Sequence, residues 1–337
     1  MKKILIYFLC FIILFFVFPV ICTNTQERVQ ETLANEDVPI KDKEEKTEYE
    51  YQKYKTIKLL HSETGQIEEL EIDQYLYGVV SSEMPANFEI EALKAQAVVA
   101  RTYTIYQIIN NSSKHENADI CDNSACCQAW ITKEERIARW APEEAEGNWN
   151  KIVEAVDSTK GRIITYNGAP INAFFHANSG GTTESSLNIW GGIDYPYLKS
   201  VETAGEDGYT QYSSEVVLSQ EELSQKIKEK YEDCEIDYSQ ENCIQILEYT
   251  TSGRIKTIKF GNKEIAGTEA RTLLGLKSTN FTYKIADGKI TFSVTGYGHG
   301  VGMSQTGADA LAKSGSNFEK IINHFYTDVK IIDINSL

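Results

Sequence analysis

The stretch from Ile72 to Ile105 reads IDQYLYGVVSSEMPANFEIEALKAQAVVARTYTI and contains the clearest helical pattern in the chain. Apolar residues at helical spacing predict a short helix that begins at Ile72 and is stopped by Pro85. A longer helix is expected to follow, with Asn87 as its N-cap and one buried stripe made of Ile90, Leu93, Ala97, Val98 and Ile105. The break between the two helices leaves Glu83 at or just past a helix end.

Hairpins are expected on both sides of these helices, at 56–72 and at 162–176. Farther along, Ser219 and Glu222 form a capping box that begins a helix, and residues 244–295 have the pattern of several strands. Two more helices are expected at 304–313 and 317–326. Because helices and hairpins alternate without a regular βαβ rhythm, the predicted fold class is α+β, with mixed helices and antiparallel hairpins that form two lobes around a substrate cleft.

The N-terminal residues have the pattern of a membrane anchor and a spacer. Ile4 to Cys22 is a run of 19 residues without a charge, which nearly spans a hydrocarbon core of about 30 Å. Lys2 and Lys3 are expected to stay cytoplasmic, and a cleaved signal peptide is the alternative. The expected organisation is an anchor over 1–22, a flexible spacer over 23–52 and an extracytoplasmic domain over 53–337.

The composition is that of a globular protein, with 42% hydrophobic and 24% charged residues. The formal net charge is −16, which repels a phosphate backbone, so nucleic acid is not an expected partner. The 19 tyrosines have aromatic faces and hydroxyl tips that suit a sugar. Composition alone, however, favours the interpretation that these tyrosines are ordinary half-buried residues of strands.

Glu83 and two cations on the following helix form the first candidate site. A carboxyl group pinned between a helix end and Pro85 is partly desolvated, which raises its pKa and suits a general acid. Lys94 and Arg101 are seven residues apart and therefore lie on nearly the same helix face. There they are candidate cationic donors to a polar ligand. Spacing alone favours the alternative, in which these three residues are simply solvated.

His115, Cys121 and Cys127 form the second candidate, with spacings of six and six in one loop. Imidazole and thiolate are the preferred zinc ligands, so this loop is a candidate zinc site. A Cys121–Cys126 disulfide is the alternative, since the domain is expected outside the cell.

Two glycine-rich segments follow strands and form the remaining candidates. His176 begins the first, HANSGGT, where glycines allow close approach of the backbone to a ligand. Farther along the chain, Tyr197 and Lys199 lie on one face if residues 195–199 are extended. The second, Gly296 to Gln305, lacks the glycine at 301 that a dinucleotide fingerprint needs, and it exposes polar groups of His299 and Gln305.

Several segments of the sequence together resemble those of the stage II sporulation protein D family. The matching segments, in order along residues 75–308, are 77–80, Glu83-Met84-Pro85, 91–98, 100–103, Cys127-Gln128, 176–181, 197–201 and 298–305. The resemblance implies a membrane-anchored lytic transglycosylase that cleaves between N-acetylmuramic acid and N-acetylglucosamine in peptidoglycan strands stripped of stem peptides. Such proteins work in the mother-cell membrane facing the forespore, with an amidase and a membrane partner, during engulfment.

The resemblance also implies the roles of individual residues. Glu83 falls on the catalytic acid, and His115, Cys121 and Cys127 resemble zinc ligands of clostridial members. The predicted substrate-binding residues are Lys94, Arg101, Gln128, His176, Ser179, Tyr197, Lys199, His299 and Gln305.

One carboxylate is enough for this reaction, because the C6 hydroxyl of the sugar replaces the water that ordinary glycosidases activate with a second carboxylate. Zinc is therefore expected to be structural. Two alternatives stay open: a non-catalytic glycan-binding module that positions an amidase, and a zinc-dependent hydrolase with a metal-bound water.

Overall fold

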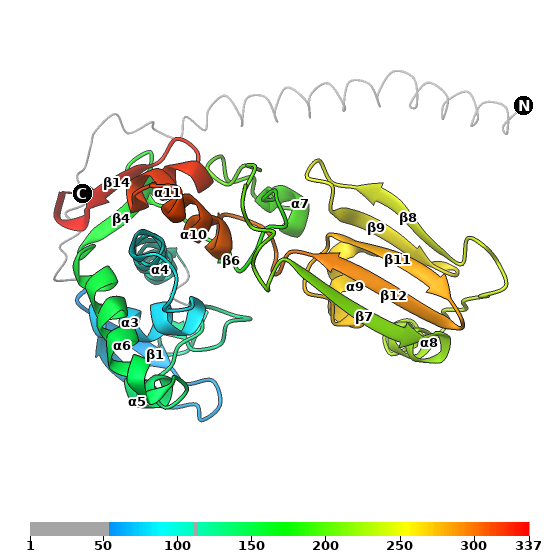
Figure 1. Ribbon diagram of the computed structural model, residues 1–337, viewed down its shortest axis with the longest axis horizontal. Coiled ribbons are helices and arrows are strands. Elements are labelled where there is room, and N and C mark those ends of the chain that lie inside the picture. Colours follow the sequence, from blue (N-terminus) through cyan, green and yellow to red (C-terminus); the bar gives the residue numbers. More distant parts are fainter. Residues whose placement is uncertain (1–53, 111–113, 337) are drawn as a thin grey trace, which may run out of the picture. The chain divides into compact units, whose positions relative to one another are not determined.

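The computed structural model describes residues 54–110 and 114–336 of the chain. Over these residues it combines helices with mostly antiparallel sheets, which confirms the predicted α+β class (Figure 1). No helix in the described residues is long and apolar enough to cross a membrane. The anchor predicted at 4–22 and the spacer predicted at 23–52 lie outside the described residues.

Helix α4 (Ile90–Asn110) is the centre of the first hydrophobic core. Every residue from Ala95 to Ile105 is buried, so the helix is enclosed on all sides rather than along one stripe. The helices packed around it are α3 (Ile72–Glu83), α6 (Pro142–Asp157), α10 (Gln305–Lys313) and α11 (Phe318–Phe325) (Figure 1). This enclosure decides where the polar residues of α4 are placed.

The predicted N-cap of α4 at Asn87 is wrong, because the helix begins three residues later, at Ile90. Residues 85–88 instead form a turn in which the Phe88 backbone N–H donates to the Pro85 carbonyl at 3.0 Å. The Glu89 N–H donates to Asp309 Oδ1 at 2.6 Å. A carboxylate from α10, far away in the sequence, therefore stabilises the start of α4.

Small sheets border the first core. The predicted hairpin of β1 (Thr56–Leu60) and β2 (Ile67–Glu71) is confirmed, and β3 (Ile120–Cys121) pairs parallel to β1. The hairpin of β4 (Arg162–Tyr166) and β5 (Ala169–Pro170) is also present, with β14 (Lys330–Asp333) on the other side of β4. Asn167 and Gly168 at its turn have φ of 50° and 80°, as the preferred two-residue turn of hairpins requires.

The expected continuation of this hairpin to His176 is wrong. Residues 175–176 form a separate short strand, β6 (Phe175–His176), which pairs parallel with β13 (Met303–Ser304). The pairing places His176 opposite Ser304. Two motifs that are more than a hundred residues apart in the sequence therefore lie side by side.

A second hydrophobic core is built from residues 218–294. One sheet contains β7 (Ser213–Ser219), β12 (Lys289–Thr295) and β11 (Phe281–Ala286), and the other contains β8 (Ile244–Tyr249), β9 (Ile255–Phe260) and β10 (Lys263–Ala266). The capping box of Ser219 and Glu222 begins α8 (Gln220–Lys228), as predicted. Helix α9 (Gly267–Leu274) interrupts the predicted strands.

Arg101 is a structural cross-link inside the first core. Its side chain is fully buried, and its guanidinium donates to the Thr159 carbonyl at 2.8 Å and to Asp73 Oδ1 at 3.3 Å. These contacts connect α4 with α3 and with the end of α6. Arg101, which was expected to contact a ligand, is therefore enclosed and held by partners within the core.

We predict that Arg101→Met lowers the free energy of unfolding by about 3–5 kcal/mol, since it removes the buried donor of both the Asp73 carboxylate and the Thr159 carbonyl and leaves Asp73 with the exposed Lys160 at 3.2 Å. Urea unfolding measures this loss. Lys199→Ala is the control, because Lys199 forms only an exposed ion pair with Asp194 at 3.6 Å, and its change is expected to stay within about 0.5 kcal/mol. A fully stable Arg101→Met protein would contradict the structural role.

Candidate active site

A cleft of about 1480 Å³ is lined by residues next to both hydrophobic cores. Its lining includes Glu83 at the end of α3, Arg271 on α9, and His176 and His299 with their neighbours in the chain. Within the described part of the chain, the carboxylates in this lining are Glu83 and Glu144, of which Glu144 is exposed to solvent. Glu83 is thus the one partly enclosed carboxyl group in the cleft.

Glu83 is the last residue of α3, because Met84 adopts an extended conformation with φ of −122° before Pro85. The Ala129 backbone N–H donates to Glu83 Oε1 at 2.7 Å, and the Gln305 side chain also hydrogen-bonds to this carboxyl group. Burial nevertheless raises the pKa of Glu83, since desolvation outweighs the two hydrogen bonds. The group therefore keeps its proton to a higher pH than an ordinary glutamate.

Gln128 holds the segment that contacts Glu83. Its side chain is buried, and its Nε2 donates to the Tyr75 hydroxyl and to Thr104 Oγ1, both at 3.1 Å. The next residue along the chain is Ala129, whose N–H reaches Glu83. Gln128 is absent from the lining of the cleft. Its side chain therefore positions the Ala129 N–H group and does not itself face a ligand.

Glu206 is a buried carboxylate near the cleft that was not apparent from the sequence. The two oxygens of Glu206 accept hydrogen bonds from the backbone of residues 179 and 181 and from the hydroxyls of Ser179, Thr203, Ser304 and Thr306. These donors lower the pKa of Glu206 although its burial acts in the other direction. Glu206 thus fixes the loop after His176 against the start of α10, where Gln305 lies.

His176 and His299 are both neutral residues of the cleft. Burial lowers the pKa of His176 to about 3, and the positive charge of Arg254 adds to this effect. The pKa of His299 is also well below its ordinary value, mainly through burial. His176 Nδ1 lies 3.2 Å from the Val301 carbonyl, so it carries the proton, and Nε2 is an acceptor. Within the described residues Nε2 has no partner.

Aromatic rings form one wall of the cleft. The ring centroids of Trp190 and His299 are 5.2 Å apart, those of His176 and His299 are 5.6 Å apart, and Phe174 lies 4.6 Å from Trp190. Trp190 is 49% exposed, which leaves much of its ring free for a ligand. Such rings suit the apolar faces of sugars. Nothing in the sequence around Phe174 or Trp190 distinguishes them from ordinary core residues.

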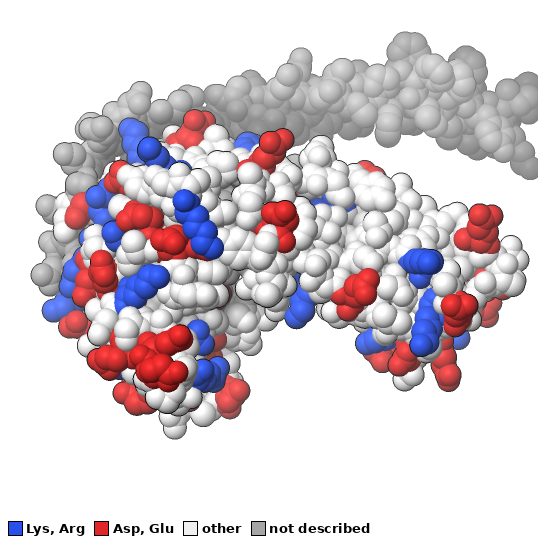
Figure 2. Space-filling model, viewed as in Figure 1, with Lys and Arg blue, Asp and Glu red and all other residues white. Residues whose placement is uncertain are grey.

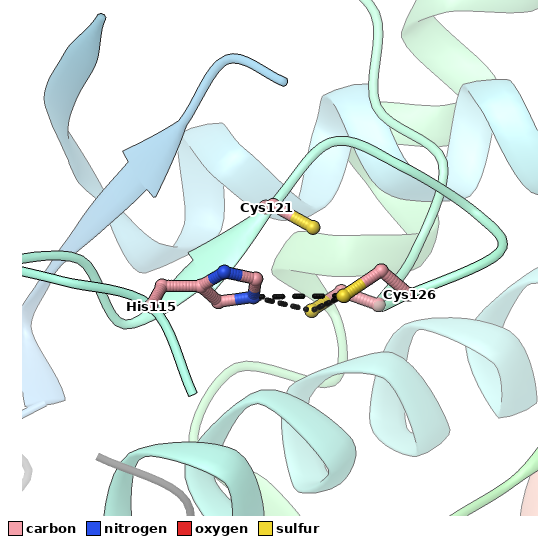
Figure 3. Close-up of side chains that lie close together, drawn as sticks. His115, Cys121 and Cys126 are labelled. Carbon is pink, nitrogen blue, oxygen red and sulfur yellow. Dashed lines mark hydrogen bonds between the residues drawn. The ribbon is translucent and has the colours of Figure 1, made fainter. Parts of the chain in front are cut away.

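The cysteine-bearing loop gathers four possible metal ligands. His115, Cys121, Cys126 and Cys127 each offer a nitrogen or sulfur atom, and these atoms lie within 4.8 Å of one another. Figure 3 shows the side chains of His115, Cys121 and Cys126 directed toward a common space. The three cysteines are free, so the alternative of a Cys121–Cys126 disulfide is not realised here.

The backbone of the loop explains how the fourth ligand joins the predicted three. The N–H groups of Cys126 and Cys127 both donate to the Asn123 carbonyl, at 3.0 and 2.7 Å. This turn brings both sulfurs toward His115, whose Nε2 lies 3.3 Å from Cys127 Sγ and 3.8 Å from Cys126 Sγ. Four such donors match the composition of a tetrahedral metal site.

The structure brings only some of the predicted substrate-binding residues to the cleft. His176, His299 and Gln305 line it together with Glu83. The remaining predicted residues have partners elsewhere in the protein. Lys94 pairs with Glu91 at 2.8 Å, Lys199 with Asp194 at 3.6 Å, Tyr197 accepts a hydrogen bond from Asn172 N at 3.0 Å, and Ser179 contacts Glu206.

The cations that line the cleft, as far as the chain is described, are Arg136 and Arg271. Neither was evident from the sequence. Arg136 belongs to the short helix α5 (Lys133–Ile137), and Arg271 belongs to α9, whose existence was not predicted. No local motif marks either residue, because only the packing of distant elements brings them to the cleft.

Comparison with known proteins identifies the family to which this α+β domain belongs. Residues 60–166 match the family described as stage II sporulation protein, and residues 198–302 match a domain of unknown function. The chain is 34% identical over 271 residues to stage II sporulation protein D of Bacillus amyloliquefaciens, with 80% of this chain and 76% of the relative covered. The Bacillus subtilis protein of the same name is also 34% identical over 271 residues, with 80% and 77% covered.

The chain therefore belongs to the stage II sporulation protein D family, which confirms the resemblance seen in its motifs and supports a role in sporulation. A more distant relative is the amidase enhancer of Bacillus subtilis. It is 29% identical over 303 residues, which cover 74% of this chain and 39% of that protein.

We predict opposite pH dependences of stability for Glu83→Gln and Glu206→Gln. A carboxyl group whose folded-state pKa is raised favours folding below its unfolded pKa of about 4.3 and loses this contribution as the pH rises. Wild type should therefore lose stability relative to Glu83→Gln as the pH rises above about 4.3. For Glu206 the pKa is lowered, so wild type should lose stability relative to Glu206→Gln as the pH falls below about 4.3.

Unfolding free energies measured by urea titration at several pH values check both signs. If the difference between wild type and Glu83→Gln did not change with pH, the carboxyl group of Glu83 would not be desolvated in solution.

Proposed function

We propose that this protein is a lytic transglycosylase of the sporulation cell wall. It cleaves the bond between N-acetylmuramic acid and N-acetylglucosamine in peptide-stripped strands, leaves a 1,6-anhydro end, and acts in engulfment of the forespore. The observation that carries the proposal is Glu83, a desolvated carboxyl group with a raised pKa in a cleft with an aromatic wall. Membership of the sporulation protein D family supports the biological setting.

The chemistry needs one group that first gives and then takes a proton. The protonated carboxyl group of Glu83 transfers its proton to the glycosidic oxygen while the bond from that oxygen to the anomeric carbon breaks. The C6 hydroxyl of the muramic acid then bonds to the anomeric carbon and gives its proton to the Glu83 carboxylate. The enzyme returns to its starting state without a water molecule, so no second carboxylate is required.

Neighbouring residues support this cycle. The Ala129 N–H and the Gln305 side chain stabilise the carboxylate after it has lost its proton, and they hold it in one orientation. The neutral His176 offers Nε2 as an acceptor for a sugar hydroxyl. Trp190 and His299 offer ring faces on which a sugar stacks. The substrate cleft thus combines one proton donor with groups that orient the glycan.

We also propose that the cluster of His115, Cys121, Cys126 and Cys127 binds a structural zinc ion. Four nitrogen and sulfur donors fill a tetrahedral site and leave no open position for a catalytic water. This closed set disfavours the zinc-dependent hydrolase. Cys126 and Cys127 also line the cleft, and Gln128 directly follows them in the chain. An ion bound by these cysteines would therefore hold this edge of the cleft in place.

The proposed location is the mother-cell membrane facing the forespore, with residues 4–22 as a single anchor and the N-terminus in the cytoplasm. Its support is the uncharged run of sequence. An amidase is the proposed partner, along with a membrane protein of the engulfment complex, because amide hydrolysis must strip the strands first. The likeness to a protein named amidase enhancer supports this pairing.

We predict that Glu83→Gln reduces cleavage of peptide-free glycan strands by about 10²–10⁴-fold, because glutamine cannot transfer the proton. Glu144→Gln is the matched control, since Glu144 lines the same cleft but is exposed, and it should retain most of the activity. Mass spectrometry of the products should show anhydro-muramic ends.

Other outcomes distinguish the alternatives. Equal losses in Glu83→Gln and Glu144→Gln, with reducing ends in the wild-type products, would indicate a hydrolase with two carboxylates. Binding of glycan without any cleavage by wild type would indicate a non-catalytic module.

For the metal, we predict about one zinc ion per chain in wild type, as the closed donor set implies, and strongly reduced zinc with a lower melting temperature in Cys121→Ser, Cys126→Ser and Cys127→Ser. The control is Cys234→Ser, which alters a buried cysteine of the second core and should retain its zinc. Elemental analysis and thermal melting check these results. Full zinc content in Cys126→Ser would show that another group is the fourth ligand.

A further inference from the structure

Arg271 is a cation of the cleft that has no anionic partner within the described residues. It lies on α9, lines the cleft and is partly buried, and this burial lowers the pKa of its guanidinium. Within the described residues its guanidinium makes no ion pair and no hydrogen bond, and the nearby group that favours its charge is Tyr297. A desolvated guanidinium is costly unless a partner compensates it.

The neighbours of Arg271 do not supply that compensation. Its charge acts on His176 and His299, which are both neutral, and on Arg254, which is also positive. Arg254 differs from Arg271, because Glu184 and Glu206 favour its charge and its Nη2 donates to the Ser179 carbonyl at 2.6 Å. Arg254 is therefore a structural residue. Arg136, the other cation of the cleft, also has no acidic partner within the described residues, but its guanidinium lies 4.7 Å from the centre of the Trp140 ring. Arg271 has no ring contact of this kind within the described residues, so it is the cation of the cleft with the least compensation.

The net charge of the chain does not favour a general attraction for anions. The chain has a formal net charge of −16, and on the face shown in Figure 2 acidic and basic side chains are interspersed. A negatively charged ligand would therefore be recognised by individual cations inside the cleft rather than by a broad basic patch. Arg271 has the planar guanidinium that binds a carboxylate through two parallel hydrogen bonds.

We propose that Arg271 binds the free carboxylate of the lactyl group of N-acetylmuramic acid and thereby selects strands whose stem peptide has been removed. The identity of the sugar rests on the function proposed above. An intact stem peptide begins with an amide at this carboxyl group, and the amide carries no charge. Hydrolysis of the amide releases the peptide amine and leaves the carboxylate, so an amide hydrolase must act before this protein does.

The position of Arg271 is consistent with this role. It lines the same cleft as the aromatic wall of Trp190 and His299, on which a sugar ring stacks, and as the proton donor Glu83. It also lies within residues 198–302, the segment that matches a domain of unknown function. The second core would thus contribute substrate selection, while the first core contributes the catalytic acid.

The test compares two substrates that differ only in charge. One is peptide-free glycan with the free lactyl carboxylate, and the other is the same glycan with this group converted to the primary amide, which has nearly the same size. Full-length wild type should prefer the carboxylate by about 10- to 100-fold in kcat/KM, as expected for a charged hydrogen-bonded pair. Arg271→Gln should abolish this preference, and Arg271→Lys should keep part of it.

Arg136→Gln is the matched control, because Arg136 is the other cation of the cleft but stacks on the Trp140 ring at 4.7 Å. It should keep the preference for the carboxylate. Loss of the preference in Arg136→Gln but not in Arg271→Gln would overturn the assignment, and so would a wild type that cleaves both substrates equally. The ratio of the two substrates is insensitive to a general loss of folded protein.

A binding measurement separates this inference from the proposed function. In the Glu83→Gln background, calorimetry with both glycans should show tighter binding of the carboxylate form, and Arg271→Gln should remove the difference. Selective binding that depends on Arg271, in a protein whose wild type cleaves nothing, would support the inference and refute the transglycosylase. Unselective binding by a protein whose wild type does cleave glycan would refute the inference alone.

Discussion

The enclosure of α4 by its neighbours is the constraint on which the rest of the structure depends. The helix is buried on all sides, so its polar side chains must find partners inside the core. Arg101 meets this requirement through Asp73 of α3 and the carbonyl of Thr159 just after α6. These contacts set α3 against α4, and the end of α3 then presents Glu83 to the cleft.

The pKa values of two enclosed glutamates are shifted in opposite directions, and the number of hydrogen-bond donors around each carboxyl group decides the direction. Glu206 accepts bonds from several hydroxyl and backbone groups, so it is ionised and serves as an anchor. Glu83 accepts bonds from Ala129 and Gln305, which do not offset its desolvation. The two arginines differ only in their neighbours, since burial lowers the pKa of both, but Glu184 and Glu206 favour the charge of Arg254 and Tyr297 favours that of Arg271.

The two glycine-rich segments, 176–182 and 296–305, contact each other in the folded protein. His176 pairs with Ser304 across two short parallel strands, and the Ser179 and Ser304 hydroxyls both donate to Glu206. An added Cβ at Gly302 would lie 2.0 Å from the Phe174 carbonyl, and one at Gly298 would lie 2.8 Å from His176 Cβ. The glycines therefore permit the close backbone approach that brings His299 and Gln305 beside His176.

The sequence by itself determined the local elements: the α3 helix and its stop before Pro85, the Asn167-Gly168 turn, the capping box at Ser219, and the family motifs that single out Glu83 and three of the cysteine-loop ligands. These features depend on neighbours in the chain, such as a proline ring or a glycine at positive φ. Only the tertiary structure decided that Arg101 and Tyr197 lie in the core, that Cys126 joins the candidate metal ligands, and that Arg271 lines the cleft. Burial and pairing with distant residues are not encoded in local spacing, because they arise when elements far apart in the sequence exclude water from between them.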